Sequence, residues 1–188
     1  MPVPARSARF LATFRVVDKK RGASLDTKTA IDSYLAGPEE LRAAVVGLSR
    51  DQLVARPVPG KWSVLEVVCH LADTDANIAH RLKRVLLEER PTFDRVQPDL
   101  MLAGLAYHAR DAEQELAILD LTRKQIAHIL NASPPQAWER TGIVGDRGDK
   151  TVAQMLNGAI EHLAHHLKFI VEKRRAMRVG DGIERHLA

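Results

Sequence analysis

The stretch GKWSVLEVVCHLAD, residues 60–73, contains both a helix start and the first candidate functional residue. Ser63-Val64-Leu65-Glu66 is a capping-box pattern, in which Ser63 is the N-cap and Glu66 the third helical residue. Apolar residues then recur at three- and four-residue intervals as far as Leu86. This spacing predicts an amphipathic helix that ends before Pro91.

Three further segments have the apolar spacing of helices, and they lie at residues 28–48, 99–130 and 151–175. Gly37-Pro38 predicts that the first segment is a short helix bent into a second one. Asp99 can cap the next segment, which we expect to be one rod of roughly 45 Å. No segment has the alternation of a strand, and residues 141–150 are expected to form a polar loop.

Four amphipathic helices predict an all-α four-helix bundle at residues 27–175, between a basic leader at 1–26 and a C-terminal tail at 176–188. Residues 1–24 contain six Lys or Arg and one acidic residue, while the whole chain has a net charge of +4. The positive charge therefore belongs to the leader, which we expect to be a flexible tail or an interaction arm. A nearly neutral bundle with few aromatic residues is not expected to bind nucleic acid.

The amino-acid composition further narrows the class of protein to which the chain can belong. The 188 residues are 45% hydrophobic and 28% charged, which is the balance of a folded domain rather than of a disordered chain. No apolar run approaches the ~20 residues that a membrane helix needs, so no membrane partner is expected. The single cysteine excludes an internal disulfide and fits a reducing cytoplasm.

Histidines gather in the run EHLAHHLKFI, residues 161–170. His162 and His166 are four residues apart and lean toward the apolar stripe of their helix, whereas His165 is expected to point at solvent. His70, at the edge of the apolar stripe of its own helix, is a third candidate on a second helix. The spacing leaves two interpretations open: a metal site built from two helices, or ordinary packed histidines.

Residues 60–73 and 161–167 together resemble the DinB-like superfamily. The first stretch is similar to its Trp-Ser pair followed by a helix with His-Leu-x-Asp, and the second to its closing pair of histidines four residues apart. The resemblance implies a four-helix bundle, often a homodimer, with a divalent metal, Zn²⁺ or Ni²⁺, on His70, His162 and His166. It implies an enzyme acting on a small molecule, either a thiol-dependent S-transferase or a metal-dependent hydrolase. The alternative is a non-catalytic, metal-binding or dimerising stress-related bundle.

Three neutral histidines would leave a metal with an open coordination position, which is the pattern of catalytic sites. Such a metal lowers the pKa of water toward ~7 and would deprotonate a low-molecular-weight thiol outright. Asp73, one turn after His70, could orient an imidazole or act as a base, or could simply pair with an arginine. Arg147 and Lys150 could hold an anionic substrate, or be solvated loop charges.

Trp62 and Cys69 flank this first histidine and have simpler explanations. Trp62 is expected to anchor the start of its helix rather than to form a substrate platform. Cys69 turns about 100° away from His70 around the helix axis, so we expect it to be buried as a packing residue.

Overall fold

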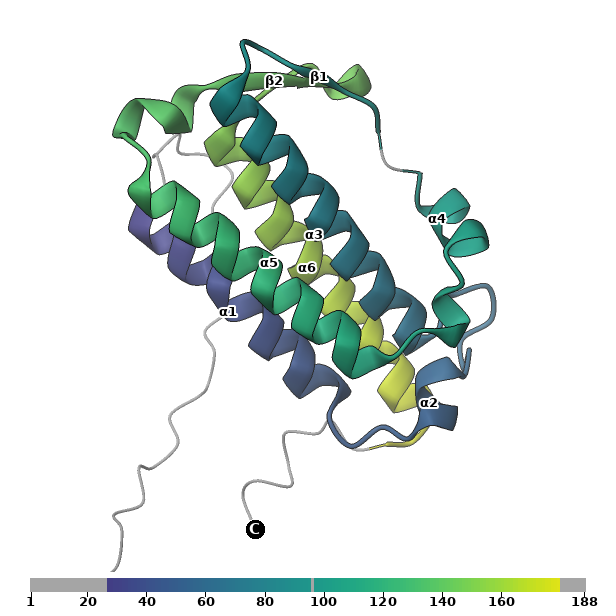
Figure 1. Cartoon of the computed structure of the whole chain (residues 1–188). Helices are drawn as coiled ribbons and strands as arrows, with labels where there is room; N and C mark the ends of the chain where they lie inside the picture. Colours follow the sequence, from purple (N-terminus) through teal and green to yellow (C-terminus); the bar gives the residue numbers. More distant parts are fainter. Residues whose placement is uncertain (1–26, 96, 180–188) are drawn as a thin grey trace, which may run out of the picture.

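The computed structural model of the chain describes residues 27–95 and 97–179, so the predicted leader at 1–26 and residues 180–188 of the predicted tail lie outside the described residues. The described residues contain six α-helices and three short strands (Figure 1). The α-helices are α1 Thr27–Val45, α2 Arg50–Val54, α3 Val64–Leu87, α4 Pro98–Gly104, α5 Ala112–Ala132 and α6 Val152–Ala176. The strands are β1 Thr92–Phe93, β2 Thr141–Val144 and β3 Asp149–Thr151, and short 3-10 helices lie at Tyr107–Ala109, Pro135–Glu139 and Gly145–Arg147.

Two capping boxes begin the helices that carry the candidate site. At the start of α3, the Ser63 hydroxyl accepts a hydrogen bond from the Glu66 amide at 3.1 Å, and the Glu66 carboxylate accepts one from the Ser63 amide at 2.6 Å. Thr151 and Gln154 form the same reciprocal pair at the start of α6. Both helix starts predicted from the sequence are therefore confirmed.

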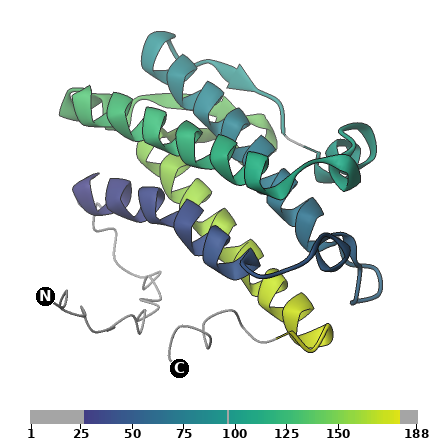
Figure 2. The same cartoon turned by 60° about the horizontal axis from the view of Figure 1, so that its bottom comes forward.

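The four long helices form the predicted bundle. Helix α3 packs against α5 and α6, and α1 packs against the same two helices, so α1 and α3 lie diagonally opposite. Figures 1 and 2 show that α3 and α5 run in one direction and that α1 and α6 run in the other. The chain therefore has to return along the bundle between α3 and α5. Within the described residues, no helix has a long enough apolar stretch to cross a membrane.

That return corrects the prediction of one long rod at residues 99–130. Residues 98–111 form the short α4 and a 3-10 turn instead, and α5 begins only at Ala112, with Asp111 as its N-cap. Asp99 is not a cap, because Gln97 holds the N-cap position of α4. Ala106 breaks the helical path with a left-handed φ of 49°. A continuous helix would have carried the chain away from the bundle end where a parallel α5 must start.

The prediction of two helices within residues 28–48 is also wrong, because α1 continues through Pro38. A proline inside a helix leaves the carbonyl four residues earlier without its amide donor, and here that carbonyl belongs to Tyr34. The buried guanidinium of Arg123 on α5 donates to it, with Nη1 2.9 Å from the Tyr34 oxygen. Arg123 also forms a two-pronged ion pair with buried Asp75 at 3.0 and 2.9 Å. The Arg123 side chain, distant in sequence, thus provides the hydrogen-bond donor that Pro38 lacks.

The expectation of no strands is the third correction. Strand β2 pairs in parallel with β1, with Thr92 opposite Ile143, and antiparallel with β3, with Gly142 opposite Lys150. The sheet lies at the end of the bundle where α3 ends and α6 begins (Figure 1). Strands of two to four residues are too short to show an alternation in the sequence. Their consequence is to fix the 141–150 segment beside α6.

Candidate metal centre

His70 is placed by the capped start of α3. It lies in the second turn of the helix and is 3% exposed. The Trp62 ring meets its imidazole edge to face, with 5.2 Å between ring centroids. On the other side, Thr74 Oγ1 is 3.5 Å from His70 Nδ1. These two neighbours fix the ring so that its Nε2 atom points toward α6.

Helix α6 brings His162 and His166 to the same point. The Nε2 atom of His162 lies 3.1 Å from the Nε2 atom of His70 and 3.1 Å from that of His166. The candidate ligand atoms of the three residues all lie within 4.8 Å of one another. Antiparallel packing of α3 on α6 thus unites a residue pair 92 positions apart in sequence. The three histidines named from the sequence are the three that the structure brings together.

The donor set fits a divalent cation. Around a tetrahedral metal with metal–nitrogen distances of ~2.0–2.1 Å, two ligand nitrogens would be ~3.3 Å apart, close to the separations seen here. Hydrogen bonding alone satisfies the cluster poorly. A neutral imidazole nitrogen carries one proton or offers one lone pair, yet His162 Nε2 faces two others at the same distance. A cation among them would use all three lone pairs at once.

Burial keeps these imidazoles neutral. Burial first, and then the charge of the neighbouring histidines, lower the pKa of His162 to about 4 and that of His166 to about 3. Burial likewise lowers the pKa of His70. Neutral imidazoles are the form that binds metals. Within the described residues, the Nδ1 atoms of His162 and His166 have no hydrogen-bond partner, so packing on α6 orients these rings.

Asp73 is not part of the cluster. Its carboxylate accepts hydrogen bonds from both Arg110 nitrogens, at 2.7 and 3.1 Å, and Arg110 also pairs with Glu115. Asp73 thus pairs with an arginine, which is one of the alternatives that the sequence left open. Thr74, rather than Asp73, is the polar neighbour of His70 Nδ1. A catalytic role for Asp73 remains a prediction.

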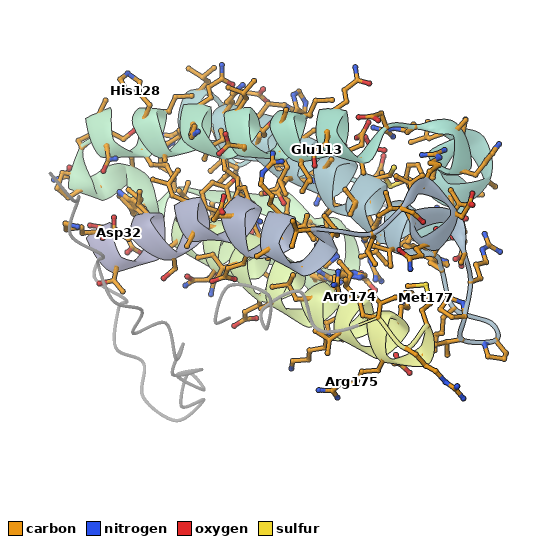
Figure 3. The ribbon with its side chains drawn as sticks, turned by 90° about the horizontal axis from the view of Figure 1, so that it is seen from below. Asp32, Glu113, His128, Arg174, Arg175 and Met177 are labelled. Carbon is orange, nitrogen blue, oxygen red and sulfur yellow. The ribbon has the colours of Figure 1, made fainter. Side chains whose placement is uncertain are left out.

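His165 lies on the face that the sequence predicts, and the remaining described histidines are far from the cluster in sequence or on its outer side. His165 is exposed, and its ring packs on Phe169 with 4.8 Å between centroids. His80, His108 and His128 are exposed, and His128 projects outward from α5 in Figure 3. His186 lies outside the described residues. Cys69 is buried, as expected, and its thiol donates to the Tyr107 carbonyl at 3.7 Å.

A groove with a volume of about 710 Å³ opens beside the cluster. That volume is in the usual range for small-molecule sites. Its walls combine residues of α3 and α6 with residues of the 141–150 segment, among them Trp62, Thr74, Arg81, Arg147, Lys150 and Gly158. Arg147 and Lys150 had been singled out from the sequence. Arg81 and Gly158 had not, although Arg81 follows His70 by 11 residues, a spacing that keeps both on one helix face.

The chain is similar to proteins of one family. It matches the sequence profile of the DinB superfamily over residues 34–170. A Bacillus licheniformis protein named "Putative metal-dependent hydrolase" is 32% identical over 145 residues, which cover 74% of this chain and 80% of that protein. An Oceanobacillus iheyensis protein with the same descriptive name is 28% identical over 133 residues, or 71% and 77% of the two chains.

A solved structure shares the fold. YfiT from Bacillus subtilis, described as "a probable metal-dependent hydrolase with an unusual four-helix bundle topology", has a TM-score of 0.79 and 25% sequence identity to this chain. The match covers 87% of this chain and 95% of YfiT. The chain belongs to the DinB superfamily, as the resemblance of residues 60–73 and 161–167 implied.

Proposed function

We propose that this protein is a hydrolase that depends on a divalent metal held by His70, His162 and His166. The observation that carries the proposal is the convergence of the three Nε2 atoms, two of whose separations are 3.1 Å. A divalent cation on such a set supplies Lewis-acid chemistry, because it polarises a substrate oxygen and brings the pKa of water near ~7. The relatives named as metal-dependent hydrolases favour hydrolysis over other reactions.

The chain's own residues would present the substrate to this centre. Trp62 covers one side of the His70 ring and also lines the groove, so it can shield the centre from water and support an apolar part of the substrate. Thr74 orients His70 through Nδ1. The low pKa values of the imidazoles keep their lone pairs available at neutral pH. None of these roles needs Asp73, which is engaged with Arg110.

Thiol-dependent S-transfer is the second candidate, since the same open position would bind and deprotonate a thiol. The chain's single cysteine cannot supply that thiol. Cys69 is buried, and burial raises the pKa of its thiol to about 12. A transferase would therefore take its thiol from a low-molecular-weight co-substrate bound in the groove. A homodimer, as the resemblance implies, is compatible with either function, and light scattering would test it.

The test is turnover by protein reconstituted with zinc or with nickel. A panel of esters and amides is offered alone, and a panel of electrophiles is offered with and without low-molecular-weight thiols. His70→Ala should abolish turnover, because two ligands hold a divalent cation poorly. His128→Ala is the matched control, since it is the same substitution at a histidine that is exposed on α5 and does not line the groove. Metal-loaded protein that turns over none of the panels would favour the non-catalytic alternative.

A further inference from the structure

The groove is long, and the histidine cluster occupies only one end of it. On α3, His70, Thr74 and Arg81 all line the groove. Arg81 is 11 residues after His70 in one continuous helix, so their backbone positions are ~16 Å apart along its axis. On α6, Gly158 and Gln154 continue the opposite wall from His162 toward the strands. A substrate that fills this groove extends well beyond the metal.

Positive charge gathers at the far end. Arg81, Arg147 and Lys150 line the groove there, and within residues 27–95 and 97–179 none of the three has a carboxylate at ion-pair distance. Arg81 donates instead to the backbone oxygen of Asp94 at 2.5 Å. A fourth cation, Arg95, is paired with Asp146 at 3.3 Å, and Glu161 is the acidic residue among the lining side chains. Three cations are thus left for a ligand.

Arg81 and Arg147 lie close enough to repel each other. Arg81 is half-buried, and its pKa is lowered first by burial and then by the positive charge of Arg147, which the negative charge of Asp94 only partly offsets. Like charges that face a partly buried space without a counter-ion are unfavourable. An anion placed between them would relieve the repulsion and would accept charge-assisted hydrogen bonds.

Gly158 leaves the middle of the groove open. It lies four residues before His162 and four after Gln154, and a Cβ built on it would have no atom within 4 Å. Any side chain at this position would project into free space between the two ends. The position therefore offers a way to narrow the groove without displacing its walls.

We propose that the groove binds an elongated small molecule whose anionic group, a carboxylate or a phosphate, is held by Arg81, Arg147 and Lys150 while its reacting end lies at the histidine cluster. This inference rests on the proposed function, because the reacting end is defined by the metal. It assigns the substrate class by length and charge: an apolar or mixed spacer, with the scissile group and the anion at opposite ends.

The experiment measures binding by isothermal titration calorimetry, with zinc-loaded and metal-free protein and with probes of defined length. The probes are butanedioate, dodecanedioate, dodecanoate and a phosphonocarboxylate as long as dodecanedioate. Dodecanedioate should bind zinc-loaded protein at least about 10-fold more tightly than dodecanoate, the factor expected from one charge-assisted hydrogen bond. The phosphonocarboxylate decides whether the far end prefers a phosphate-like group to a carboxylate.

Two sets of variants locate the anion. Arg81→Gln/Arg147→Gln/Lys150→Gln should abolish the advantage of dodecanedioate over dodecanoate. The matched control removes three positive charges outside the groove, as Lys83→Gln/Arg84→Gln/Lys124→Gln, and should keep that advantage. The single Arg147→Gln variant carries the test if the triple variant does not fold, because Arg147 is exposed. Gly158→Leu should weaken dodecanedioate more than butanedioate.

The outcomes separate the two proposals. An unchanged advantage in the groove variants, or an equal loss in the control, overturns the anion site even if zinc is bound. Protein that takes up no zinc but binds dodecanedioate through the three cations would refute the metal centre and keep the anion site. Protein that takes up zinc but binds dodecanedioate independently of the three cations would keep the metal centre and refute the anion site.

Discussion

Replacing Gly37 should destabilise this protein because a side chain there would clash with Arg123, although helix propensity alone predicts a gain in stability. It lies inside α1, where Arg123 of α5 reaches across to the Tyr34 carbonyl freed by Pro38. A Cβ at position 37 would overlap Arg123 Nη1 and lie 3.0 Å from Leu163 Cδ1. Gly37→Ala therefore has to displace the guanidinium that completes the hydrogen bonding of α1.

The magnitude follows from what Arg123 would lose. In an unobstructed helix interior, Gly→Ala stabilises by ~1 kcal/mol. Here the Arg123 side chain is 1% exposed and holds Asp75, 1% exposed, in a two-pronged ion pair. Losing one hydrogen bond from a charged donor costs ~1.5–3 kcal/mol, and breaking a buried ion pair costs ~3–5 kcal/mol. Taking the disrupted ion pair as the dominant loss, ~3–5 kcal/mol, and subtracting the helix gain of ~1 kcal/mol, we expect Gly37→Ala to lower the free energy of unfolding by about 2–4 kcal/mol.

Urea unfolding followed by circular dichroism at a helix band measures this change. Gly158→Ala is the matched control, because it is the same substitution in the interior of α6 with no atom within 4 Å of the new Cβ. It should raise the free energy of unfolding by ~0.5–1 kcal/mol. The two substitutions should therefore shift the midpoint in opposite directions. A Gly37→Ala protein as stable as the wild type would refute the account of Arg123 and Pro38.

Three further results are expected at other sites. Cys69 should resist thiol reagents at pH 8 in the folded protein and react on unfolding, since it is buried and its pKa is raised to about 12; labelling of folded protein would contradict this. The pKa of Glu66 is lowered: burial would raise it, but hydrogen bonds, above all from Arg56, outweigh that effect. Its stabilisation is present above the ordinary pKa of 4.5 and is lost as pH falls through the lower folded value, so Glu66→Gln should be less stable than wild type at pH 7 and converge with it in acid. Asp73→Asn should lower stability by ~1 kcal/mol or less through its partly exposed pair with Arg110 and leave metal content unchanged; lost metal would instead place Asp73 in the centre.

The parts of the fold that depend on local patterns could be read from the sequence. The capping box at Ser63 predicted where α3 begins, because both partners of its hydrogen bonds lie within four residues, and the apolar spacing after Thr151 predicted the start of α6. Helical periodicity then put His162 and His166 on the inner face and His165 on the outer one. The position of His70 on its helix made it the third candidate, but the choice of a metal site over packed histidines needed the resemblance to the superfamily, since periodicity does not say which helices pack together.

The parts that depend on distant contacts could not be read this way. The sequence shows Pro38 but not that Arg123, 85 residues later, supplies the missing donor. Because α3 and α5 run parallel, the chain between them has to return along the bundle. Residues 99–130 therefore do not form the single helix that the sequence predicts. Arg81 becomes notable only when the strands bring Arg147 beside it. In each case the decisive partner is on another element.

The metal content of the untagged protein tests the central claim most directly. Elemental analysis is made on the wild type, on His162→Ala/His166→Ala and on His165→Ala, each purified and then reconstituted with zinc or nickel in the same way. We predict about one zinc or nickel per chain in the wild type and in His165→Ala, and none in the double variant, since three imidazole ligands are the usual catalytic set. Wild-type protein that holds no metal after reconstitution, or a double variant that holds as much as the wild type, would contradict the account.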